Sequence, residues 1–151
     1  MAAYAVSISG ATASTSNDTV TFLTTATGQG SNIAVYEVHL GGEASSSAVL
    51  RLAVDRSTGG TTPGGAYTLV KLSPSAPNPA FSTASTWVAQ PTLSGSRPLT
   101  PTFNAFGGQY KWLAAPDRPI VVGTQGAVAN LSVRSLSGTS VFSGTILTEE
   151  L

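Results

Sequence analysis

Hydrophobic and polar residues alternate along several short stretches of this chain. The period is two, which is typical of β-strands that bury one face and expose the other. The alternation is clear in residues 33–40, where one face carries Tyr36, Val38 and Leu40 and the other carries Glu37 and His39. It recurs in residues 48–55, where Leu50, Leu52 and Val54 oppose Arg51 and Asp55.

Nine short segments have this strand character, and most are bounded by Gly, Pro, Asn or Ser. They are residues 4–9, 19–25, 33–40, 48–55, 66–71, 110–114, 119–122, 129–136 and 140–147. So many short strands with almost no helical pattern predict a single all-β domain over residues 1–151, either a sandwich or a barrel. The last strand is expected to hold the C-terminal end of the chain in place through its pairing.

Neighbouring strands in the sequence suggest antiparallel pairs. Segments 33–40 and 48–55 are joined by a short polar turn, so we expect them to pair and to bring Glu37 or His39 close to Arg51. The same reasoning pairs the last two strands, in which Leu131 and Val133 alternate with Ser132 and Arg134, and Phe142 shares a face with Ile146.

Residues 73–103 interrupt the strand pattern. Six of the nine prolines lie here, which excludes a helix or a central strand running through the segment. Two interpretations remain open, because a long structureless segment in a compact domain usually contacts something. It is either a connection that packs on its own fold or an arm that grips a neighbouring subunit. Its apolar anchors would make the contacts: Phe81, Trp87, Leu93, Leu99 and Phe103.

Composition argues against several classes of function. Lys and Arg number seven and so do Asp and Glu, and charged residues make up only 9% of the chain against about 25% in an ordinary soluble domain. No basic cluster exists to bind nucleic acid, and no stretch is apolar enough to cross a membrane. Ser and Thr together number 40. A weakly charged, hydroxyl-rich surface of this kind favours a protein that works inside an assembly.

Reactive side chains are few. There is no cysteine and one histidine, His39, so neither a disulfide nor a thiolate metal site is expected. A serine nucleophile would have to use His39 as its base with Glu37 to orient it, and Glu37, His39 and Glu43 lack the usual spacing of metal ligands. The seven carboxylates show no evident glycosidase pair. We therefore expect no enzyme activity, no metal, no cofactor and no small-molecule substrate.

Two glycine-rich stretches are interpreted as turns. Residues 55–65, DRSTGGTTPGG, lack the lysine and the following helix of a phosphate-binding loop. We expect a hairpin tip there, with Gly59 and Gly60 available for contact with another protein surface. Residues 103–110, FNAFGGQY, are expected to form a second hairpin.

Exposed aromatic residues could stack on sugar rings, and the candidates for such a carbohydrate site are Tyr67, Trp87, Tyr110 and Trp112.

Three stretches carry a resemblance to a known group of proteins. They are VYEVHLGGEASSSAVLRLAVDRSTGGTTPGG, then QPTLSG with PTFNAFGGQYKWLAAP, then SVRSLSGTSVFSGTIL with its EEL ending. Together they resemble small β-rich virion proteins of tailed bacteriophages, of the capsid decoration or cement type. The resemblance implies an antiparallel sandwich, jelly-roll-like or tulip-like, that is often a homotrimer. It would bind the major capsid protein on the outer surface of the head and stabilise contacts between capsomers.

Two other functions are compatible with the same sequence. The chain could be a carbohydrate- or receptor-binding module, or a component of a phage tail or baseplate. The first nine residues lack the features of a secretory signal, so we expect a complete product, made in the host cytoplasm from Met1 and then built into the virion.

Overall fold

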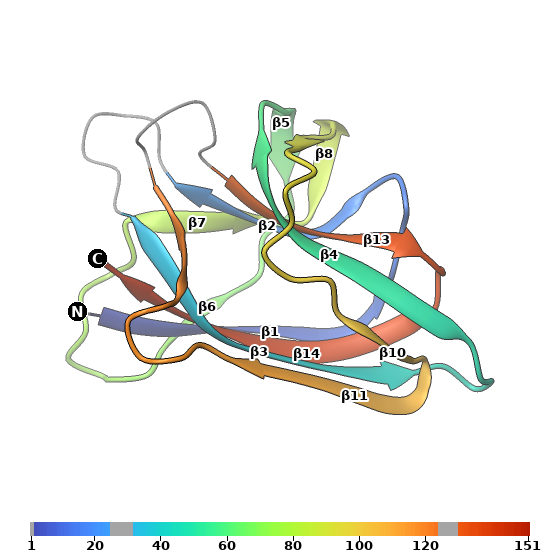
Figure 1. Cartoon of the computed structure of the whole chain (residues 1–151). Helices are drawn as coiled ribbons and strands as arrows, with labels where there is room; N and C mark the ends of the chain where they lie inside the picture. The colour runs from blue at the N-terminus through green and yellow to red at the C-terminus, as the bar shows by residue number, and fades with distance from the viewer. Residues whose placement is uncertain (1, 25–31, 124–129) are drawn as a thin grey trace.

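The computed structural model describes residues 2–24, 32–123 and 130–151, which form two antiparallel sheets packed face to face and a small two-stranded ribbon (Figure 1). Sheet A has the order β11 (Phe106–Leu113), β3 (Ile33–Glu43), β14 (Val141–Glu150), β1 (Ala2–Thr12) and β6 (Leu69–Lys71), and β12 (Ile120–Val122) also pairs with β3. Sheet B has the order β10 (Thr102–Asn104), β4 (Val49–Thr58), β13 (Asn130–Ser137), β2 (Asp18–Thr24) and β7 (Phe81–Ala84), with β9 (Thr92–Leu93) on β4. The ribbon consists of β5 (Thr61–Gly64) and β8 (Thr86–Ala89).

Eight of the strands have the order of a jelly roll. Counted along the chain as β1, β2, β3, β4, β10, β11, β13 and β14, those of sheet A lie in the order first, eighth, third, sixth. Those of sheet B lie in the order second, seventh, fourth, fifth. Strands at matching positions in the two sheets are therefore consecutive in this count: first with second, eighth with seventh, third with fourth, and sixth with fifth. The predicted all-β sandwich is confirmed, and its strand order is that of the jelly roll.

Each of the nine predicted segments contains a strand. Residue 25, at the end of one segment, and residue 129, at the start of another, lie outside the described residues. The predicted pairing between them is wrong in two places. β3 lies in sheet A and β4 in sheet B, so Glu37 and His39 do not meet Arg51 across a ladder. β13 and β14 are likewise in different sheets. Alternation shows which face of a strand is buried, but it does not show which strand pairs with it. A strand has the same alternation whether it pairs with the preceding strand or crosses to the opposite sheet.

Both glycine-rich stretches also differ from the predicted hairpins. After Thr58 the chain bends through Gly59 and Gly60, and β5 pairs with β8 rather than with β4. In residues 103–110, a single residue separates β10 of sheet B from β11 of sheet A, and Ala105 is completely buried at this corner. The two glycines after it lie where the register of β11 against β3 shifts, which marks a β-bulge.

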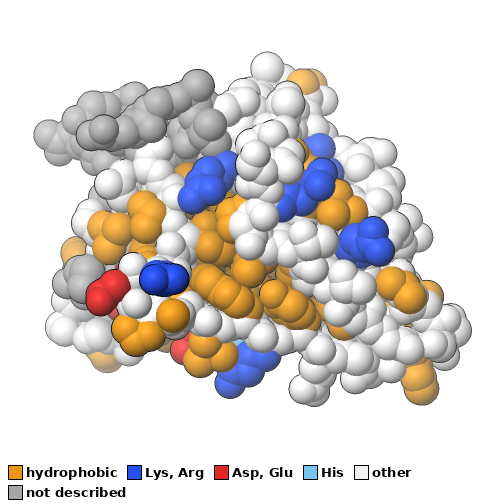
Figure 2. Space-filling model, in the orientation of Figure 1, with side chains coloured by type: hydrophobic (Ala, Val, Ile, Leu, Met, Phe, Trp, Pro, Cys, Tyr) orange, Lys and Arg blue, Asp and Glu red, His pale blue; other side chains and the backbone are white. Residues whose placement is uncertain are grey.

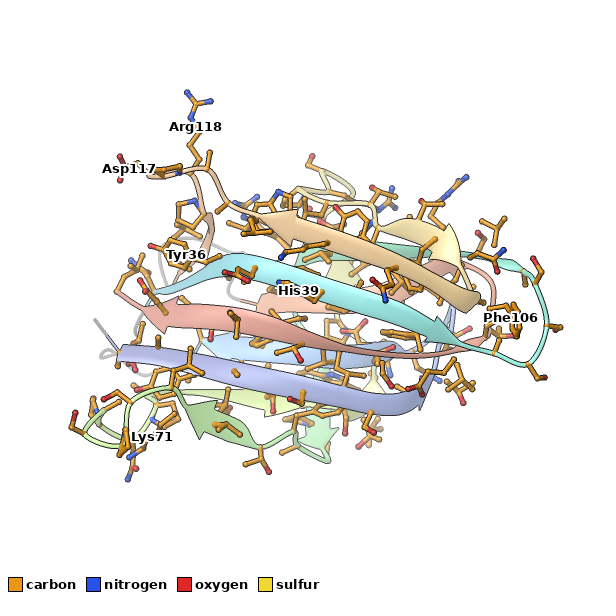
Figure 3. The ribbon with its side chains drawn as sticks, turned by 90° about the horizontal axis from the view of Figure 1, so that it is seen from below. Tyr36, His39, Lys71, Phe106, Asp117 and Arg118 are labelled. Atoms are coloured by element: carbon orange, nitrogen blue, oxygen red, sulfur yellow. The ribbon has the colours of Figure 1, made fainter. Side chains whose placement is uncertain are left out.

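The core lies between the two sheets. Its largest fully buried side chains include Tyr4 and Phe142 from sheet A and Phe22, Leu52 and Leu131 from sheet B. Tyr4 also packs edge-on against Phe81, with ring centroids 5.5 Å apart. One predicted core position is wrong. The register of β3 against β14 shifts between Val35 and Glu37, so Tyr36 faces away from the core (Figure 3) and Val35 is buried in its place.

Candidate interaction surfaces

His39 lies near the middle of β3 on the outer face of sheet A (Figure 3). Its Nε2 atom is 2.8 Å from Glu37 Oε2, and both side chains are partly exposed. Thr145 is the residue paired with it on β14, yet among the described residues Glu37 is the only hydrogen-bond partner of the imidazole. The arrangement is a hydrogen-bonded pair of side chains on an open strand face. The part of the chain that the structure describes also contains no group of three His, Cys, Asp or Glu side chains that could hold a metal ion.

Asp18 is a buried carboxylate that anchors part of the proline-rich segment. Its Oδ2 atom accepts hydrogen bonds from the hydroxyls of Thr21 (2.6 Å) and Ser132 (2.5 Å), and its Oδ1 atom accepts one from Nε of Arg134 at 2.6 Å. Arg134 also donates through Nη2 to the carbonyl of Pro91 at 2.8 Å. The backbone N–H of Asp18 donates to Oε1 of Gln90 at 2.9 Å. The carboxylate is thus fully satisfied, as a buried charge requires.

Asp55 makes a second attachment on β4. Its carboxylate accepts hydrogen bonds from the hydroxyl of Ser94 (2.6 Å) and from the backbone N–H of Gly95 (3.0 Å). Arg97 lies farther away, with Nε 3.8 Å from Asp55 Oδ2. Residues 90–97 are therefore held by the backbone of β2 and by side chains of β13 and β4. In this structure the proline-rich segment packs on its own fold.

In the sequence both aspartates are among seven scattered carboxylates, and no pattern singles them out. Apart from Thr21, three residues from Asp18, their side-chain partners lie between 39 and 116 residues away in the chain. Only Asp55 has a position in the local sequence that points to such a role, because it lies on the polar face of β4 with Arg51 and is nevertheless buried. A polar residue at such a position needs a partner from elsewhere if the surface over it is covered.

The residues predicted to contact a partner occupy different environments. Phe81 and Phe103 are buried in the core of this chain. Leu93 and Leu99 are partly buried along β4, and Trp87 is partly exposed on the ribbon. Gly59 and Gly60 are both exposed at the bend before β5. In this conformation the two phenylalanines present no surface to a partner.

Trp87 forms one wall of a pocket of about 410 Å³. Its Nε1 donates to the hydroxyl of Thr21 at 3.1 Å, so the indole is tied to the network around Asp18. Tyr67 lies on the same pocket, whereas Tyr110 and Trp112 lie on β11 and pack against the core. Of the four aromatic residues considered for sugar stacking, two therefore come together.

A larger pocket of about 700 Å³ lies beside the loop at residues 72–78, and Glu150 is the one titratable side chain in its lining.

Large hydrophobic side chains are exposed along the edge of sheet A. Phe106 (61% exposed) and Leu113 (52%) mark the two ends of β11, and Val121 on β12 is also exposed. Figure 3 shows Phe106 at one end of the sandwich, away from the other labelled residues. Figure 2 shows hydrophobic side chains gathered across the middle of the molecule, with Lys and Arg side chains spaced singly around them. We call this edge of sheet A, which carries the exposed Phe106, Leu113 and Val121, the β11 edge; the exposed Gln109 and Lys111 lie between Phe106 and Leu113 along the strand.

All four tyrosines have their pKa raised above the ordinary value of 10.0. Burial is the largest cause in each case. The carboxylate of Glu150 further raises the pKa of Tyr4, whose hydroxyl lies 3.3 Å from Glu150 Oε2. Glu149 does the same for Tyr36. These tyrosines therefore remain neutral in the folded protein at physiological pH.

Comparison with protein-family models, with curated proteins and with solved structures finds no match to this chain. The architecture itself is an all-β sandwich with jelly-roll strand order. No helix that could span a bilayer occurs in residues 2–24, 32–123 or 130–151.

Proposed function

We propose that this chain is a non-enzymatic structural protein of a tailed-phage particle. In this proposal it is a decoration protein that forms a homotrimer, binds the major capsid protein on the outer surface of the head and stabilises capsomer contacts. The single observation that carries the proposal is an edge strand of a jelly-roll domain, β11, that exposes a large apolar side chain at each end. Jelly rolls occur in viral capsid proteins as well as in lectins and cupins, and exposed apolar side chains at a sheet edge favour association with another protein.

The polar side chains support a structural role. Asp18 and Asp55 are used to fasten the chain to itself, and His39 is paired with Glu37. Lys and Arg residues are spaced singly on the face seen in Figure 2, which gives no continuous positive surface for nucleic acid. What remains for contact is hydroxyl-rich and apolar surface, and such surface suits a partner made of protein.

The β11 edge fits an interface between copies of the chain. β11 pairs with β3 on one side, and no described strand pairs with its other side. In a ring of three copies the exposed side chains of Phe106 and Leu113 would be covered in each copy in the same way. A trimer would also contact several capsomers at once, which raises the apparent affinity for the shell.

The test begins with light scattering after size exclusion. We expect a species of about 46 kDa, three times the 15.2 kDa chain. Leu113→Glu should convert it into a folded monomer, because a carboxylate would be placed on a surface that association dehydrates. Val88→Glu is the matched control, since Val88 is 80% exposed but lies on the ribbon. A wild-type protein that elutes as a monomer would contradict the trimer.

The location on the particle needs a separate measurement. The purified chain is mixed with phage heads that have been stripped of it and is then sedimented, and intact virions are labelled with an antibody for electron microscopy. Cosedimentation and a label on the head are the expected results. A label confined to the tail would replace the decoration role with that of a tail or baseplate component.

A further inference from the structure

The pocket beside Trp87 has the features of a ligand site. Three parts of the chain meet there: the turn from β1 to β2, Tyr67 before β6, and the ribbon strand β8 with the residues next to it. The lining consists of Ala11, Thr12, Ser14, Asn17, Asp18, Thr19, Tyr67, Ser85, Thr86, Trp87 and Gln90. Its volume of about 410 Å³ lies within the range of roughly 300–1,000 Å³ that is usual for small-molecule sites.

Hydrogen bonds hold the walls in place. Gln90 is tied to the backbone of Asp18 (2.9 Å) and the indole of Trp87 is tied to Thr21 (3.1 Å). The backbone N–H and C=O of Tyr67 both bond to the hydroxyl of Thr83, each at 2.9 Å. The hydroxyl of Ser14 accepts from the backbone of Asn17 at 3.0 Å. The pocket is therefore formed before any ligand binds, which lowers the entropic cost of binding.

The charge of the lining selects the class of ligand. No Lys or Arg belongs to the lining, so an anion such as a phosphate finds no counter-charge. Asp18 is the one carboxylate of the lining, and both of its oxygens already accept from Thr21, Ser132 and Arg134. What the pocket offers instead is two aromatic rings with hydroxyl and amide groups between them. Neutral sugars present the matching surface, with apolar ring faces and hydroxyls at their edges.

Asn17 supplies an open hydrogen-bonding group of the lining. Its side chain is exposed and makes no hydrogen bond among the described residues, so its amide is available to a ligand. The hydroxyl oxygen of Thr19 also has no partner among the described residues, but less than 1 Å² of that atom is accessible, so a ligand in the pocket does not reach it.

We infer that this pocket binds a neutral carbohydrate, with Trp87 and Tyr67 as the stacking walls and Asn17 and Gln90 as hydrogen-bonding groups. The inference goes beyond the proposed structural role and does not depend on it. A domain attached to a particle through its β11 edge would keep this pocket free, because the pocket is lined from β1, β2 and β8 rather than from β11. The particle would then carry many copies of a weak sugar-binding site, and many weak sites together bind strongly.

The experiment uses the full chain carrying Trp112→Phe, so that Trp87 is its only tryptophan. This protein is applied to an array of neutral bacterial surface oligosaccharides, neutral mucin-type oligosaccharides and sialylated oligosaccharides. The sugars that bind are then titrated in solution while Trp87 emission is recorded. We expect binding of neutral members with a change in Trp87 emission, and the two neutral groups distinguish a bacterial source from an animal one.

Asn17→Ala tests the hydrogen-bonding part of the lining directly. The Asn17 side chain makes no hydrogen bond among the described residues, so its removal should not lower the melting temperature. We expect the variant to weaken binding about 2- to 10-fold, the loss of one hydrogen bond. Thr145→Val on sheet A is the control and should leave binding unchanged.

Three results would overturn the inference. The first is a folded protein that binds no neutral sugar on the array. The second is binding that Asn17→Ala does not weaken. The third is binding that leaves Trp87 emission unchanged, because the sugar would then lie elsewhere on the molecule.

Discussion

Gly59 and Gly60 stand side by side at the bend before β5 but differ in their surroundings. Both have positive φ angles, 71° and 88°, so any side chain there is strained by about 1–2 kcal/mol. A Cβ atom at Gly59 would meet nothing within 4 Å, whereas one at Gly60 would lie 2.7 Å from Cζ3 of Trp87. Gly60 is thus required by close packing as well as by its backbone conformation.

We predict that Gly60→Ala destabilises the fold more than Gly59→Ala does. Gly59→Ala carries the backbone cost alone, and Gly60→Ala must also displace the indole. The free energies of unfolding in urea, followed by tryptophan fluorescence, measure the difference, and Gly59→Ala is the matched control. Equal losses for the two variants would show that Trp87 moves aside without cost.

At the same scale, the sequence could identify which residues face the core along each strand. Leu50, Leu52 and Val54 are buried as alternation predicts. Tyr36 was assigned to the wrong face, because one extra residue in β3 reverses the alternation and leaves no mark in the pattern of residue types. The contacts around Asp18 were beyond prediction, since they depend on the path of residues 85–97 over sheet B.

Among the elements, the two arginines that reach buried aspartates form a natural comparison. Arg134 is mostly buried and donates to Asp18 at 2.6 Å, while Arg97 is partly exposed and lies 3.8 Å from Asp55. Asp55 keeps Ser94 and Gly95 as donors without Arg97. Asp18 would keep only hydroxyl donors without Arg134.

We predict that Arg134→Met costs about 3–5 kcal/mol, because it leaves a buried carboxylate without its counter-charge. Arg97→Met should cost no more than about 1 kcal/mol, the usual range for an exposed pair. Chemical unfolding of both variants measures the two losses. Arg134→Met with Asp18→Asn should recover part of the stability, and no recovery would mean that the loss came from the contact with Pro91.

The positions of the long strands could be predicted from the sequence, and their partners could not. β5, β7, β8, β9 and β10 span two to four residues each, which is too short for a period of two to show. The pairing of the long strands failed for another reason. A turn as short as residues 138–140 can lead back into the same sheet or across to the other one, and only the packing of the whole domain decides between them.

For the molecule as a whole, the tyrosines set the response to alkali. Each has a folded pKa above 10.0, so above that pH the unfolded chain loses protons that the folded chain retains. The free energy of unfolding should therefore be unaffected by these groups below pH 10.0 and should fall as the pH rises through their folded pKa values. Urea unfolding at increasing pH, with tyrosinate absorbance recorded in parallel, tests this.

Tyr110→Phe provides the control for that measurement, since it removes one of the four groups and should reduce the alkaline loss. Tyrosinate absorbance separates this effect from the titration of lysine. If tyrosinate appears at the pH of free tyrosine while the protein remains folded, the burial of these side chains does not govern the alkaline response.

The position of β14 has a consequence for how the protein is made. β14 lies between β1 and β3 and pairs with both, so sheet A cannot close until the last of these strands has left the ribosome. Until then β1 and β3 each have an unpaired edge. The emergence of β14, rather than of any earlier strand, is then the event that lets the sandwich fold, and a message cut short before β14 would yield a chain with two unpaired edges and no native sheet A.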